Sequence, residues 1–165
     1  MIVLGIDPGC SATGYSVVRR RAGRYELLTA GVIRTKSQTP MPQRLNTIHS
    51  RLVEVLEQWT PDTVAIEAIF RHRSSESALR LGQARGVALL AAAQHAMTVS
   101  AYNPMTVKKT VGGHGRAGKA EMIRVVSRLV GSDKPLAADA ADASAIAITH
   151  LVNSAFSDRL AGVRS

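Results

Sequence analysis

The run Ile2-Val3-Leu4-Gly5-Ile6-Asp7-Pro8-Gly9 decides how the N-terminal part of this chain folds. Its apolar residues predict a buried β-strand, and the Pro-Gly pair predicts the turn that ends it. Asp7 therefore stands where an apolar strand stops. A carboxylate in that position needs a cation, a hydrogen-bond donor or a proton, because burying an unpaired charge is costly.

Three more acids stand in apolar surroundings. The apolar run Thr63-Val64-Ala65-Ile66 also ends in an acid, Glu67. Asp139 and Asp142 lie in an alanine-rich stretch that predicts a helix. Residues three apart on a helix are about 60° apart, so both side chains can face one point.

Convergence of these four acids favours a metal site. Two carboxylates about 4 Å apart repel by roughly 4 kcal/mol at an effective dielectric constant near 20. Protonation or bound cations relieve this repulsion, and oxygen ligands without His or Cys suit Mg²⁺ or Mn²⁺. Two such ions about 4 Å apart activate a water and stabilise the leaving oxygen of a phosphodiester.

Each acid also has a purely structural interpretation. Asp139 and Asp142 can complement the dipole at the start of their helix. Asp7 can cap the following turn, and Glu67 can pair with an arginine. The recurrence of acids at two strand ends and one helix start nevertheless favours the metal site.

Length and charge limit the classes of protein. The 165 residues suffice for one domain with a full hydrophobic core. Lys and Arg outnumber Asp and Glu by 21 to 12, and this net charge of +9 indicates a polyanionic partner, nucleic acid first. No apolar stretch is long enough to span a bilayer and the first residues predict a strand, so we expect a cytoplasmic protein without membrane partners. The single cysteine, Cys10, predicts a small buried thiol.

The apolar pattern predicts one α/β domain over residues 1–156, with a mixed sheet and helices on its faces, and a flexible basic tail over 157–165. The first three strands should form an antiparallel meander. The helix over 75–95 has little polar face in its second half, so we expect that half to be buried in the core or against a second subunit. The predicted strands cover 2–7, 13–19, 25–35, 63–67 and 98–102, and the predicted helices cover 42–59, 75–95, a segment from 104, 119–130 and 137–156.

Several spaced motifs between residue 2 and about residue 150 together resemble one known family. They are Gly5-Ile6-Asp7-Pro8-Gly9 with Thr13-Gly14-Tyr15, Ala65-Ile66-Glu67 with Phe70, Leu81-Gly82-Gln83-Ala84-Arg85-Gly86, and Asp139-Ala140-Ala141-Asp142-Ala143 with Ala147-Ile148-Thr149-His150. This set resembles the RuvC family of Holliday-junction resolvases. The resemblance implies an RNase H-like fold with a five-stranded sheet, a homodimer, and Mg²⁺-dependent paired nicking of four-way DNA junctions during homologous recombination and repair. It also implies association with a branch-migration motor.

The resemblance places the catalytic acids on Asp7, Glu67, Asp139 and Asp142, which are also the expected ligands of two Mg²⁺ ions, with Mn²⁺ as a substitute. In this interpretation Asp7 bridges both ions, Glu67 and Asp142 hold one each, and Asp139 completes the site. Some members of the family carry His at the position of Asp139.

The resemblance further identifies the glycine-rich segment 112–118 as a mobile DNA-binding loop, with Lys108, Arg116 and Lys119 on the DNA backbone. The spacing of glycines and lysine there also fits a nucleotide-binding loop. Ala120, however, replaces the hydroxyl residue that would hold Mg²⁺, and the preceding segment predicts a helix instead of a strand. A nucleotide site is therefore disfavoured.

A second predicted DNA contact follows Glu67. Phe70 stands beside the basic residues Arg71 and Arg73, and an aromatic side chain in such a loop can stack on bases or wedge between them. Arg85 is assigned to DNA binding as well. The alternative interpretation of this segment is an ordinary solvated turn.

Three alternative functions remain open at this point. Another RNase H-like nuclease that acts on RNA would have the same sheet and acids, because fold does not fix substrate. A non-catalytic junction-binding protein would not need the intact acids. Asp7-Pro8-Gly9 also resembles the first phosphate loop of actin-like ATPases, but this chain is too short for their duplicated domains.

Overall fold

The computed structural model describes residues 1–68, 75–113 and 118–162, with side-chain burial through residue 156. Its five strands are β1 (Ile2–Asp7), β2 (Ala12–Arg21), β3 (Arg24–Arg34), β4 (Thr63–Glu67) and β5 (Val99–Tyr102). Its helices are α1 (Met41–Trp59), α2 (Ser75–Gln94), α3 (Pro104–Gly112), α4 (Lys119–Leu129) and α5 (Ala138–Gly162). The predicted elements are all present, with ends that differ by a few residues.

The strands form one mixed sheet in the order β3-β2-β1-β4-β5. Strands β1, β2 and β3 pair antiparallel, which confirms the predicted meander. Strand β4 pairs parallel with both β1 and β5. The β2–β3 turn has positive φ at Ala22 and Gly23 (49° and 78°), the backbone of a two-residue hairpin turn whose twist matches that of the strands.

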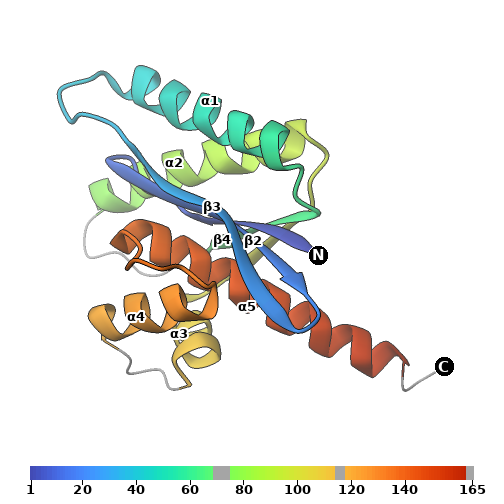
Figure 1. Ribbon diagram of the computed structural model, residues 1–165. Helices are drawn as coiled ribbons and strands as arrows, with labels where there is room; N and C mark the ends of the chain where they lie inside the picture. The colour runs from blue at the N-terminus through green and yellow to red at the C-terminus, as the bar shows by residue number, and fades with distance from the viewer. Residues whose placement is uncertain (69–74, 114–117, 163–165) are drawn as a thin grey trace.

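Helices cover both faces of the sheet (Figure 1). Helices α1 and α2 pack on one face around a core that includes Leu4, Ile6, Ile48, Leu52 and Ile66. Helices α3, α4 and α5 pack on the other face, and their core includes residues such as Val3, Val126, Ile146 and Ile148. The prediction of an α/β domain with helices on both faces is confirmed.

Two glycines let helix α5 lie directly against the sheet. A Cβ atom on Gly5 would stand 2.1 Å from the backbone oxygen of Ala143, and one on Gly14 would stand 1.9 Å from that of Asp139. Any larger residue would therefore push the helix away from β1 and β2. The first turns of α5 consequently rest on the end of β1 where Asp7 stands.

Helix α2 has one buried and one exposed side. Four alanines of α2 face the core, whereas Leu79 and Leu90 are 64% and 52% exposed. The apolar second half of α2 is therefore only partly covered by its own chain. Helix α5 continues to Gly162, so it includes six residues of the segment that the sequence assigned to a flexible tail; the basic tail itself stays a prediction.

Candidate active site

Asp7 and Glu67 stand side by side at the ends of two neighbouring parallel strands. Ile6 of β1 is in register with Ile66 of β4, so the next residue of each strand leaves the sheet at the same edge. The two carboxyl groups share a hydrogen bond, and both side chains are half-buried. The pairing of β1 with β4 thus brings together two acids that are sixty residues apart in the sequence.

Helix α5 brings Asp139 and Asp142 to the same edge. Gly14 is paired with Asp7 across β1 and β2, and the backbone of Asp139 lies on Gly14. Both acids of the helix act electrostatically on Asp7. The structure therefore gathers all four acids that the sequence singled out.

Burial and the charges of this cluster together favour the protonated form of Asp7. Burial is the largest cause that raises the pKa of Asp7, followed by the negative charges of Glu67 and Asp142, the hydrogen bond to Glu67 and the charge of Asp139. Together they raise the pKa of Asp7 from 3.8 to about 8. Asp7 consequently carries a proton at neutral pH unless a cation takes its place.

Two lysines face the cluster from α3 and α4. Burial raises the pKa of Asp142, the charge of Asp139 adds to this rise, and the positive charges of Lys119 and Lys108 oppose it. Both lysines are exposed. A hollow of about 60 Å³ adjoins the acids and is lined by Glu67, Pro104, Val107, Lys108, Met122, Asp142, Ala145 and Ile146.

The remaining predicted DNA contacts have different outcomes. Lys108 and Lys119 lie near the acids, as their predicted role requires. Arg85 is half-buried, and its Nε donates a hydrogen bond to the backbone oxygen of Glu67 at 3.3 Å. Arg85 thus fastens α2 to the end of β4, a contact that the sequence did not predict. Four predicted residues lie outside the described part of the chain: Phe70, Arg71, Arg73 and Arg116.

The donor set fits hard divalent cations. Its ligand atoms are carboxylate oxygens, which Mg²⁺ and Mn²⁺ prefer, and such a cation would neutralise the charges of Glu67, Asp142 and Asp139 that act on Asp7. Within the described residues, no three His, Cys, Asp or Glu side chains are oriented to hold one ion together. A cation bound between Asp7 and Glu67 would replace the hydrogen bond that these two side chains share.

A histidine and the single cysteine, residue types that often serve in active sites, are part of the core here. His150 is 9% exposed, and its Nδ1 lies 2.9 Å from the hydroxyl oxygen of Tyr102. The thiol of Cys10 is buried and donates to the backbone oxygen of Arg80, which confirms the prediction of a small buried thiol. The sequence missed Gly14 as the support of Asp139, although Gly14 is part of a quoted motif.

An all-oxygen cluster at the ends of adjacent parallel strands, closed by a helix that lies across the sheet, is the arrangement of an RNase H-like nuclease. Comparison with known proteins narrows this class. The family model described as Crossover junction endodeoxyribonuclease RuvC matches residues 3–150. The chain belongs to the RuvC family.

Individual relatives agree with this assignment. Crossover junction endodeoxyribonuclease RuvC of Solidesulfovibrio magneticus is 42% identical over 163 residues, which covers 99% of this chain and 96% of that protein. The Thermus thermophilus RuvC structure has a TM-score of 0.86 and 38% identity, over 95% of this chain and 97% of that chain. The same protein in complex with Holliday junction substrate has a TM-score of 0.88 and 39% identity, over 93% and 94% of the two chains.

Proposed function

We propose that this protein cleaves four-way DNA junctions by paired, symmetric nicks and depends on Mg²⁺ held by its four clustered acids. The observation that carries the proposal is the convergence of four carboxylates, which the pairing of β1 with β4 and the contact of Asp139 with Gly14 bring to one edge of the sheet. The family supports a nuclease, and a relative with 39% identity has been seen in complex with Holliday junction substrate.

The chemistry follows from the placement of the chain's own groups. Asp7, Glu67, Asp139 and Asp142 would hold the cations, which supply water activation and stabilisation of the leaving oxygen in phosphodiester hydrolysis. Lys108 and Lys119 stand beside Asp142, where their positive charges attract the backbone phosphates of DNA. Arg85 holds the end of β4, and with it the backbone of Glu67, in place.

A nicking assay tests this function. A synthetic four-way junction, a linear duplex and a structured RNA are incubated with the protein, with and without Mg²⁺. We expect the junction to be cut fastest, in two strands of like polarity, and only with the metal. Faster cleavage of the RNA would favour the alternative RNase H-like activity. Junction binding without any Mg²⁺-dependent cleavage would favour the non-catalytic alternative.

We further propose that the active form is a homodimer joined through α2. A four-way junction has near two-fold symmetry, so a two-fold dimer places one acid cluster on each of two equivalent strands. The exposed Leu79 and Leu90 on α2 support this surface. Leu90→Glu should give a folded monomer in sedimentation experiments, whereas a wild-type protein that is already monomeric would contradict the proposal.

The family resemblance supports a wider setting in homologous recombination and DNA repair, with association to a branch-migration motor, in the cytoplasm with the DNA. Co-purification of such a motor with the wild-type protein on junction DNA would test this association. None of the helices in the described part of the chain is both long and apolar enough to cross a membrane.

A further inference from the structure

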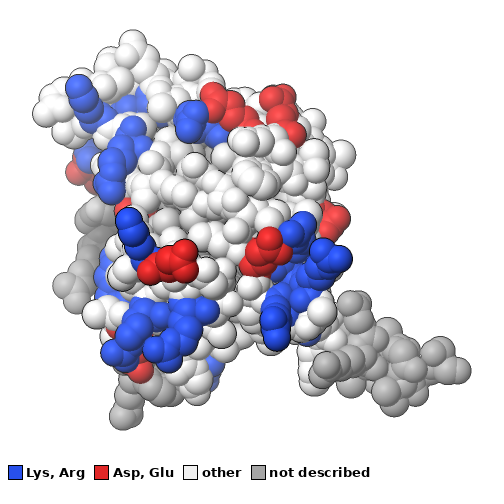
Figure 2. Space-filling model, viewed as in Figure 1, with Lys and Arg blue, Asp and Glu red and all other residues white. Residues whose placement is uncertain are grey.

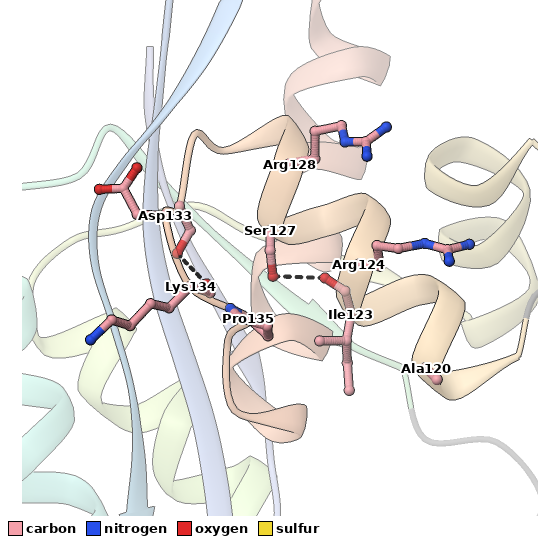
Figure 3. A pocket seen from close by; sticks show the side chains of 9 residues that line it. Ala120, Ile123, Arg124, Ser127, Arg128, Asp133, Lys134 and Pro135 are labelled. Atoms are coloured by element: carbon pink, nitrogen blue, oxygen red, sulfur yellow. Dashed lines mark hydrogen bonds between the residues drawn. The ribbon is translucent and has the colours of Figure 1, made fainter.

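Helix α4 and the connection that follows it line a hollow of about 430 Å³ (Figure 3), and none of the four clustered acids is among its lining residues. Its floor is largely apolar, and charged side chains stand around it (Figure 3). The lining residues are Ala120, Ile123, Arg124, Ser127, Arg128, Ser132, Asp133, Lys134 and Pro135. A second hollow of about 340 Å³ lies against Arg124, Val125, Arg128 and Leu129.

Arg124 and Arg128 form a ridge between the two hollows. They project from the same side of α4, while Lys134 extends from the opposite side of the larger hollow (Figure 3). Residues four apart on a helix are about 6 Å apart along its axis. A ridge with an open hollow on either side suits an extended polymer better than a small anion, which needs a surrounding cage of donors.

The two arginines are not explained by folding. Like charges four apart on a helix destabilise it by about 0.2–0.5 kcal/mol. Arg124 and Arg128 have no ion-pair partner within the described part of the chain; Arg21 and Arg24 have none there either, but only Arg124 and Arg128 line both hollows. Arg124 and Arg128 are both exposed. An anionic ligand would supply the missing partner.

The scaffold beneath the ridge is fixed by hydrogen bonds. The Ser127 hydroxyl donates to the backbone oxygen of Ile123 at 2.7 Å and accepts from the backbone nitrogen of Leu136 at 3.1 Å. The hydroxyl of Ser132 donates to the backbone oxygen of Lys134 at 2.7 Å. Because these hydroxyls are already used, a ligand would be recognised by the charged groups alone.

The ridge lies on the solvent side of the helix that begins beside the acid cluster. Lys119, which acts on Asp142, opens α4, and at 1.5 Å per residue Arg124 and Arg128 lie about 8 and 14 Å further along the helix. Lys and Arg side chains gather over α4 (Figure 2). At 100° per residue the two arginines also point about 140° and 180° around the helix from Lys119, so DNA would reach them across the solvent side of α4.

We propose that Arg124 and Arg128 bind the phosphate backbone of a junction arm that lies against the solvent side of α4. This inference rests on the proposed junction cleavage and extends the DNA contact beyond Lys108 and Lys119. The net charge of +9 and the gathering of Lys and Arg side chains over α4 (Figure 2) favour DNA over an acidic protein segment.

The test compares two double variants that each remove two positive charges. Arg124→Ala/Arg128→Ala should bind a four-way junction tenfold or more weakly at 0.1 M salt, with a slope of log affinity against log salt lower by about 1.8, which is two phosphate contacts. The control, Arg21→Ala/Arg24→Ala, removes exposed arginines from the β2–β3 turn and should leave that slope unchanged. Cleavage at saturating protein should survive in both variants.

A chemical change in the DNA completes the test. Methylphosphonate linkages, placed one at a time along the junction arm, remove single phosphate charges, and at one or more positions they should weaken wild-type binding but not binding by Arg124→Ala/Arg128→Ala. An unchanged salt slope, equal weakening by the control variant, or additive effects of protein and DNA changes would overturn the inference. Loss of poly-glutamate binding with intact junction binding would overturn it in favour of an acidic protein partner. Failure of the wild-type protein to bind or nick junctions would instead count against the proposed function.

Discussion

Asp7→Asn should stabilise the folded protein at neutral and higher pH while it abolishes cleavage. The pKa of Asp7 is about 8 in the folded state, against 3.8 as its ordinary value. The unfolded chain therefore releases the proton of Asp7 at lower pH than the folded protein does. Between these two pH values the free energy of unfolding of the wild type falls as pH rises, because the folded state binds more protons.

The size of this effect follows from the shift in pKa. A rise from 3.8 to about 8, at 1.36 kcal/mol for each pH unit, gives an upper limit on the order of 5 kcal/mol near pH 8. Because Asn cannot ionise, the free energy of unfolding of the variant does not fall in this way as pH rises. The two proteins should be equally stable near pH 4, and the variant should be the more stable by a few kcal/mol at pH 8. For a chain of this size that is a difference in Tm of roughly 5–15 °C.

Denaturant titrations from pH 4 to pH 9 measure this difference, and Asp133→Asn, at an exposed position, is the matched control. Mg²⁺ should stabilise the wild type at pH 8 but have little effect on Asp7→Asn, since a ligand that binds only the folded state raises stability by mass action. Junction binding should persist, while cleavage should fall by at least about a hundredfold, given several kcal/mol from the metals. Parallel pH curves for wild type and Asp7→Asn, or near-normal turnover by the variant, would refute the reasoning.

Three further predictions concern single residues. Lys119→Ala should lower the slope of log junction affinity against log salt by about 0.9, which corresponds to one phosphate contact. An unchanged slope in binding titrations would mean that Lys119 is an ordinary solvated residue that does not contact DNA. Gly14→Ala should lower stability by about 1–3 kcal/mol in thermal melts and slow cleavage, because its Cβ would collide with the backbone of Asp139, whereas Gly82→Ala, with open space at its Cβ, should do neither. Phe70→Ala should reduce junction cleavage about tenfold or more with an unchanged Tm, as expected for a residue that stacks on a base; a loss of about 3–5 kcal/mol in stability would make it a core residue instead.

Local sequence patterns were sufficient to predict the strands and helices and to single out the four acids. Strand β1 and its turn follow from five apolar residues and Pro8-Gly9, and the helical segments follow from apolar spacing and from the proline that opens α3. Asp7 and Glu67 were found because an acid at the end of a buried strand needs a compensating group. These inferences depend on residues within one or two turns of each other, where chain geometry is fixed by the backbone.

Only the tertiary structure decided how these parts meet. The parallel pairing of β1 with β4 and the contact of Asp139 with Gly14 join residues that are 60 and 125 positions apart, and no local pattern specifies such pairings. The pKa of Asp7 depends on those contacts, because burial and neighbouring charge cause its rise. The hydrogen bond of Arg85 to the backbone of Glu67 and the hollows on either side of Arg124 and Arg128 likewise became visible only once α2 and α4 had been placed. Residue types and their periodicity determined which groups are present, and the free energy of packing distant segments together determined which of them act as one site.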